Sequence, residues 1–227
     1  MKRARFNTYG EFLNEGLDPS KFLTQEQIDW CDMCIEQRWW VNSKGEVTVV
    51  KNLTVHDRRA RGKGVDIERF PVKFAPVKGH FICAGIDTLI SLEGSPSRVE
   101  GGFDCSLCEN LPSLVGGPIW VGGEFDCGYT KKLVSLEGAP EHVGGSFSCR
   151  LSRSLETLEG APAFVGGSRI ATGIRGVPSF DIEHCDNLPP ALVGIIRDYN
   201  EKKMDWKMAH KLIHSDTARK ARTIGLI

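Results

Sequence analysis

Hydrophobic positions recur with a period of 22 residues along the middle of the chain, and glycine, proline and polar positions separate them in a fixed order. A valine is followed four residues later by a phenylalanine and two residues after that by a cysteine. The three columns are Val77, Val99, Val121, Val143 and Val165, then Phe81, Phe103, Phe125 and Phe147, then Cys83, Cys105, Cys127 and Cys149. Leucine and proline columns keep the same spacing. The period predicts a solenoid, because so short a unit can bury its apolar side only against its neighbours.

Each unit is expected to contain one short strand and one return. The Phe-x-Cys triplet alternates inward and outward positions, as a strand with one buried face does. The glycines and proline of the Leu-Glu-Gly-x-Pro and Val-Gly-Gly phrases then turn the chain and let its backbone approach the neighbouring unit. In the fifth copy Arg169 replaces the phenylalanine, Ile170 takes the position expected to face outward and Ala171 takes the place of the cysteine. A shortened sixth rung is expected at residues 180–182.

The segments on either side of the repeat predict caps for the ends of the solenoid. Thr24 and Gln27 have the spacing of a capping box before a helical pattern, and residues 47–50 and 53–55 have the composition of strands. After about residue 190 the apolar spacing becomes helical.

The expected architecture is an α/β repeat solenoid with short parallel strands. Its predicted parts are a tail or targeting peptide at 1–16, an α+β N-terminal cap at 17–72, the solenoid at 73–190 and a C-terminal helical cap at 191–227.

The cysteines allow three interpretations: disulfides, metal ligands or packing. Neighbouring rungs would bring column cysteines within cross-linking range, and the pairs Cys31 with Cys34 and Cys105 with Cys108 have the spacing of a zinc site. However, Ala171 continues the column, so its members share apolar volume and not thiol chemistry. We favour packing, because free cysteine behaves as a small buried hydrophobe. No metal or cofactor is expected, and a reducing compartment is the simpler setting.

Composition argues against several classes of partner. The 227 residues include 29 basic and 29 acidic ones, so no net charge draws the chain to nucleic acid or anionic lipid. No apolar run approaches the length of a membrane span. Basic residues cluster in the loop at 58–63 and again in the tail from residue 202. A nucleic-acid binder that uses the loop is therefore an alternative, because phosphate binding uses such clusters. Acidic residues interrupt this tail and no aromatic platform for bases is present, so we favour a solvated helix face there.

Catalysis has little support in the sequence. The six histidines form no motif with a nucleophile, although His184 stands beside Cys185. His210 and His214 are one helical turn apart, but no glutamate accompanies them as in a metalloprotease motif. The recurring Gly-Gly lacks the lysine and hydroxyl residue of a phosphate-binding loop. We therefore expect a protein that is not an enzyme.

Functional positions are expected on the outward side of the strands, because the inward positions hold the stack. Asp104 and Asp126 should be direct neighbours, with Glu124 close by. Like charges opposed across a ladder destabilise it by about 0.2–1 kcal/mol, so this acidic patch suggests a binding surface. The plain alternative is a solvated sheet face whose aspartates contact water. The candidate partner-binding residues are Asp104, Asp126, Glu124, Ser148, Arg150 and Asp181.

The phrase Ser-Leu-Glu-Gly-Ala-Pro-x-x-Val-Gly-Gly-x-Phe-x-Cys at residues 135–149 resembles leucine-rich-repeat-like arrays in proteins of tailed bacteriophages. The resemblance covers residues 73–190 and implies a right-handed leucine-rich-repeat-like solenoid of phage origin. The chain departs from the ordinary leucine-rich pattern, since phenylalanine and cysteine replace two leucines and no asparagine column is present.

Residues 8–16 are similar to the capsid-targeting peptide of internal head proteins in large phages. This similarity implies cleavage between Glu15 and Gly16. The plain alternative is an amphipathic helix packed on the cap.

We therefore expect a phage-encoded protein-interaction module that binds a host or phage protein through the strand face, in the host cytoplasm. One alternative is a virion protein packaged in the phage head, and another is a nucleic-acid binder that uses the loop at 58–63. The oligomeric state is left open.

Overall fold

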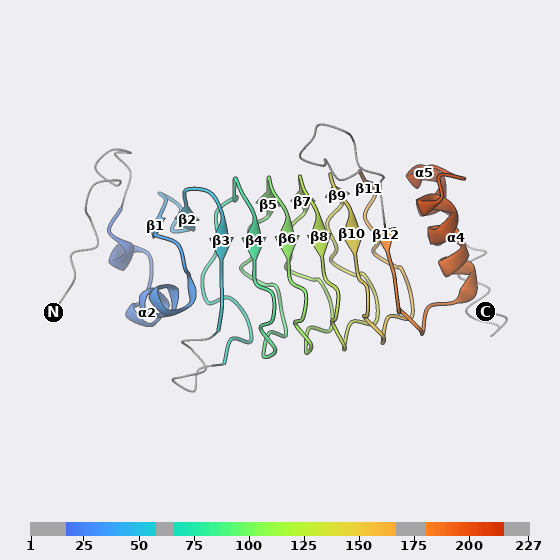
Figure 1. The fold of residues 1–227 in the computed structure, drawn as a ribbon. Coiled ribbons are helices and arrows are strands. Elements are labelled where there is room, and N and C mark those ends of the chain that lie inside the picture. Colours follow the sequence, from blue (N-terminus) through green and yellow to red (C-terminus); the bar gives the residue numbers. More distant parts are fainter. Residues whose placement is uncertain (1–16, 58–65, 167–179, 216–227) are drawn as a thin grey trace.

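The computed structural model describes residues 17–57, 66–166 and 180–215. They form a β-solenoid of stacked turns with helices at both ends (Figure 1). The predicted solenoid of short parallel strands with capped ends is therefore confirmed.

One parallel sheet of six strands runs along the solenoid, in the order β12-β10-β8-β6-β4-β3. Each phenylalanine of the repeat pairs with the phenylalanine of the next turn, as Phe81 does with Phe103. Their buried rings stack with centroids 4.7–5.3 Å apart from Phe81 to Phe180. The strands are β3 (Leu53–Thr54), β4 (Phe81–Ile82), β6 (Phe103–Asp104), β8 (Phe125–Asp126), β10 (Phe147–Ser148) and β12 (Phe180–Asp181).

A second parallel sheet follows the valine column, in the order β11-β9-β7-β5. Its strands are β5 (Arg98–Val99), β7 (Trp120–Val121), β9 (His142–Val143) and β11 (Phe164–Val165). The expectation of one strand per unit was therefore wrong. A strand of two residues is too short to show an alternating pattern, so the sequence did not distinguish it from the return.

The fifth repeat also differs from its prediction. Phe147 pairs directly with Phe180 and Ser148 with Asp181, so no turn lies between β10 and β12. Arg169, Ile170 and Ala171, expected in that position, lie outside the described residues. Val165 still pairs with Val143, so the extra residues are inserted between the two strands of one turn. The rung predicted at residues 180–182 is confirmed as β12, but it follows β10 directly. The prediction placed residues 169–171 between these strands because it counted residues along the chain, whereas Phe180 resumes the column.

The cysteines lie in the core, and all eight are free and buried. Burial raises the pKa of the Cys105 and Cys127 thiols well above their ordinary value. A second column, three residues after the first, donates hydrogen bonds to carbonyls of the preceding turn. These bonds run from Cys108 Sγ to Cys83 O (3.3 Å), from Ser152 Oγ to Cys127 O (3.3 Å) and from Cys185 Sγ to Cys149 O (3.0 Å). The Cys105-x-x-Cys108 spacing is thus explained by two adjacent core columns.

The N-terminal cap contains a 3-10 helix η1 (Pro19–Lys21), α2 (Gln25–Cys34) and an antiparallel pair, β1 (Trp39–Val41) with β2 (Val47–Val49). The predicted capping box is present, because Thr24 and Gln27 exchange side-chain and backbone hydrogen bonds. Phe70 and Phe74 pack edge-on against Phe81, with ring centroids 5.8 and 5.5 Å away. β3 lies within the range predicted as the cap, yet it already pairs in parallel with β4.

The C-terminal cap consists of α4 (Pro190–Asn200) and α5 (Trp206–Ile213). Trp206 stacks on Phe180, with centroids 5.1 Å apart, and so ends the phenylalanine stack. The Asn200 side chain covers the free edge of β12: its Oδ1 accepts the Phe180 N–H and its Nδ2 donates to the Phe180 carbonyl, each at 3.0 Å. An open edge would otherwise offer these groups to another chain.

Replacing Asn200 by alanine should expose this edge. Two half-buried backbone groups of Phe180 lose their partner, so we expect a loss of about 1–3 kcal/mol in the free energy of unfolding. Urea unfolding measures this loss. The control is N187A, which changes an exposed asparagine between β12 and α4. Equal stability of N200A and N187A would contradict the edge-capping role.

The Val-Gly-Gly glycines should be essential where two turns approach each other. A Cβ on Gly123 would lie 2.8 Å from backbone atoms of Gly101 and Gly102, which cannot move aside without shifting a turn. We expect G123A to destabilise the protein by about 1–3 kcal/mol. The control is G194A in α4, where the nearest atom is 3.9 Å away, and it should stabilise the helix by up to about 1 kcal/mol. Denaturant unfolding compares the two, and a neutral G123A would contradict the close approach.

Candidate functional site

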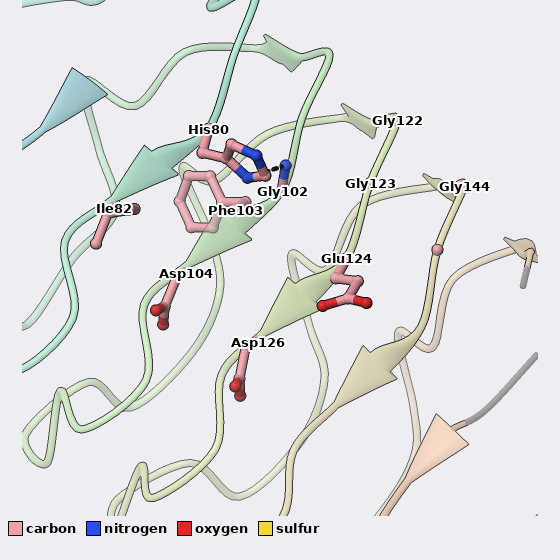
Figure 2. Close-up of a pocket in the computed structure, with 11 residues that line it drawn as sticks. His80, Ile82, Gly102, Phe103, Asp104, Gly122, Gly123, Glu124, Asp126 and Gly144 are labelled. Carbon is pink, nitrogen blue, oxygen red and sulfur yellow. Dashed lines mark hydrogen bonds between the residues drawn. The ribbon is translucent and has the colours of Figure 1, made fainter. Parts of the chain in front are cut away.

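A groove of about 490 Å³ runs across successive turns on the outward face of the first sheet (Figure 2). It extends from β4 across β6 and β8 to the glycines that precede β10. Its lining residues are His80, Ile82, Gly102, Phe103, Asp104, Gly122, Gly123, Glu124, Asp126, Gly144 and Gly145.

The floor of the groove consists of the Val-Gly-Gly glycines. Gly123 and Gly145 each donate a backbone hydrogen bond of 2.8 Å to the glycine one turn earlier, so the floor is a rigid ladder. No side chain can stand on it, because Cβ atoms at these positions would meet the backbone of the preceding turn. His80 is exposed near one end, where its Nδ1 accepts the Gly102 N–H at 3.0 Å.

One wall of the groove is acidic. Asp104 and Asp126 occupy neighbouring positions in the parallel register, as the sequence predicts, and both are half-buried. Glu124 is exposed beside them, and all three project from the same face (Figure 2). Burial raises the pKa of Asp126 above its ordinary value, and the charges of Asp104 and Asp181 raise it further, against the lowering effect of the Gly128 N–H. Three carboxyl groups and His80 are the titratable groups of this lining.

The aspartates also have a local structural role. Oδ1 of Asp104 accepts the Ser106 N–H at 2.9 Å, and Oδ1 of Asp126 accepts the Gly128 N–H at 2.8 Å. Asp181 makes the same bond to the N–H two residues later, at 3.0 Å. Such bonds stabilise the turn after the strand, so they account for part of the preference for aspartate in this column.

The other predicted partner-binding residues do not line the groove. Ser148 and Asp181 continue the column of Asp126 on the next two strands. Arg150 lies beyond that column, where it pairs with Glu183 at 3.4 Å and lies 5.9 Å from the Tyr129 ring centroid. The structure therefore brings together three of the six residues.

The remaining candidates lie outside the described residues or away from the groove. Glu15 and Gly16, and the basic loop at 58–63, are not described, so processing and nucleic-acid binding remain predictions. His210 in α5 and His214 directly after it lie together, with ring centroids 4.2 Å apart. Within the described ranges, no three His, Cys, Asp or Glu residues gather as metal ligands would.

The sequence reasoning missed a second outward feature, which lies on the second sheet. The residues directly before the valines form an outward stack on the second sheet: Arg98, Trp120, His142 and Phe164. The Arg98 guanidinium lies 3.5 Å from the Trp120 ring centroid, and the three rings follow with centroids 5.3 and 4.4 Å apart. We call this stack the aromatic ladder. Its signal was a column of aromatic residues with the same 22-residue spacing as the valines.

Neither a protein-family model, nor a curated protein, nor a solved structure matches this chain. The phage resemblance of residues 135–149 therefore stays a prediction. No helix in the described part of the chain is long and apolar enough to cross a membrane.

Asp126 should weaken the folded state at neutral pH. Because its pKa is raised on folding, the carboxyl contributes stability below its ordinary pKa of 3.8, and this contribution is lost as the pH rises through the raised value. We expect D126N to be more stable than the natural protein at pH 7 by about 0.2–1 kcal/mol, since asparagine keeps the acceptor for Gly128 and removes the repulsion. The advantage should disappear below pH 3.8.

Urea unfolding between pH 3 and pH 8 measures this difference. The control is E159Q, which removes a charge from an exposed turn. A D126N variant that is less stable than the natural protein at pH 7 would show that the charge supports the fold.

Proposed function

We propose that the protein is a non-catalytic interaction module that binds a partner protein in the groove on the first sheet. The observation that carries this proposal is a preformed groove with a rigid glycine floor and an acidic wall. Backbone bonds between turns hold that floor in place, so docking would order few additional groups. A preorganised surface binds better for that reason.

The energetics of the acidic wall support the same proposal. Asp104 and Asp126 stand directly opposite each other and Asp126 is partly withdrawn from water, which opposes its ionisation. A cationic group of a partner would relieve this repulsion on binding. Positions that disfavour the free fold are often those that function requires.

The proposal includes the source of the protein and the class of its partner. The resemblance of residues 135–149 to phage repeat arrays suggests a phage-encoded protein that acts on a host or phage protein in the host cytoplasm. The free, buried cysteines suit a reducing environment.

Affinity capture from bacterial lysate with and without phage infection tests the proposal, with mass spectrometry of the retained proteins. The natural protein is compared with the double variants D104N/D126N, which keeps both turn acceptors, and D104R/D126R, which reverses the charge. The control is E137R/E159R, which reverses two exposed charges of the turns that contain Asp126 and Ser148, away from the residues that line the groove.

We expect a partner that the natural protein and the control retain, that the asparagine variant retains weakly and that the arginine variant loses. Circular dichroism and thermal unfolding establish that every variant is folded. Equal capture by all four proteins, or no specific capture by any, would contradict binding through the groove.

A further inference from the structure

The aromatic ladder borders the groove. Gly122 lies on the groove floor, and a Cβ placed on it would be 2.6 Å from Cη2 of Trp120. The Trp120 ring thus covers this glycine at the margin of the floor. The carboxyl groups of β6 and β8 line one side of the groove, and Trp120 of the aromatic ladder lies just outside the lining, next to Gly122.

Trp120 and His142 expose ring edges and not ring faces. Arg98 covers one face of Trp120 and His142 covers the other, with an interplanar angle of 4° between the two rings. His142 in turn lies between Trp120 and Phe164, at 6° to the latter ring. Nucleic-acid bases bind aromatic side chains by stacking on their faces, so this arrangement is unsuited to them. The acidic wall would also repel phosphate.

The ladder has the composition of a protein-interaction surface. Phe164 is 47% exposed, and Ile119 beside Trp120 is 59% exposed. Tryptophan and arginine are enriched among the residues that contribute most to protein interfaces. Large contiguous apolar patches on a protein surface mark interaction sites.

The dimensions suit a linear chain. The groove crosses four turns, and parallel strands lie about 4.8 Å apart, so its length is about 14 Å. An extended peptide advances about 3.3 Å per residue and would place four or five residues along it. Alternate side chains of an extended peptide point to opposite sides, so one set would face the carboxyl groups and the other set the ladder.

We infer that the occupant of the groove is an extended peptide segment in which lysine or arginine alternates with apolar residues. The cationic side chains pair with Asp104, Asp126 and Glu124, and the apolar ones pack against the ring edges of Trp120 and Phe164. This inference rests on the proposed function and adds the chemistry of the partner segment and a role for the aromatic ladder.

Selection from a random dodecapeptide library on the immobilised full-length protein tests the inference. We expect enriched peptides to contain lysine or arginine and apolar residues two positions apart. The affinity of a synthesised peptide for each variant is then measured by fluorescence anisotropy. Enrichment of acidic peptides, of peptides without basic residues, or of none at all would overturn the inference.

Two groups of variants measure separately how the aromatic ladder and the aspartates contribute to peptide affinity. W120A should weaken peptide binding at least about tenfold and W120F by less, as expected for a central aromatic contact. F22A, which removes an exposed aromatic ring from the N-terminal cap, is the matched control and should leave affinity unchanged. D104N/D126N should also weaken binding, and more so at low salt, because its contacts are ionic. Thermal unfolding establishes that W120A is folded, and W120F provides the second readout if it is not.

The outcomes distinguish this inference from the proposed function. Loss of binding in D104N/D126N with W120A and W120F both unchanged would leave the groove as the site and overturn the role of the ladder. Unchanged binding in both groups would overturn the inference, while the lysate capture would still decide the proposed function. If a single-stranded oligonucleotide binds as tightly as the selected peptide, the ligand of the groove is a nucleic acid and the inference is overturned.

Discussion

Backbone hydrogen bonds between equivalent positions of successive turns are the interaction on which this structure depends. The Phe81 N–H donates to the Gly102 carbonyl at 2.9 Å, and Phe103 repeats the bond to Glu124 at 2.8 Å. Because these bonds hold each turn in register with the next, a side chain meets its own equivalent one turn away. The phenylalanine stack, the cysteine columns, the acidic wall and the aromatic ladder are all consequences of that register.

The register also imposes a steric constraint that links the fold to the groove. Turns approach so closely at the Val-Gly-Gly phrase that a Cβ would overlap the neighbouring backbone. The glycines that permit stacking therefore leave a floor without side chains, with columns of larger residues on both sides. A stack of this kind also has two ends with unpaired groups. The two caps cover these ends by different means. At the first turn the rings of Trp30, Phe70 and Phe81 pack edge-on, whereas at the last turn the Asn200 amide takes the place of a further strand.

The aspartate column shows how one residue type can serve both the fold and the candidate site. Oδ1 of Asp104 and of Asp126 stabilises the turn after each strand through a local hydrogen bond. That bond alone favours aspartate, as the same geometry at Asp181, outside the groove lining, demonstrates. What distinguishes the groove is the concentration of charge, since two such aspartates and Glu124 gather above a floor that carries no side chains.

The sequence by itself determined the solenoid, the inward columns, the capping box at Thr24 and the adjacency of Asp104 and Asp126. The capping box follows from the local spacing of Thr24 and Gln27, and the other features follow from a fixed period, because identical spacing forces equivalent residues into the same environment. Only the tertiary structure decided the second sheet, the position of Phe180 and the proximity of Trp120 to the groove. A strand of two residues carries too little pattern to be recognised, and an insertion changes spacing along the chain without changing the stack. The acidic wall and the aromatic ladder come from separate columns, and the path of the backbone around each turn brings Asp126 and Trp120 near the same floor.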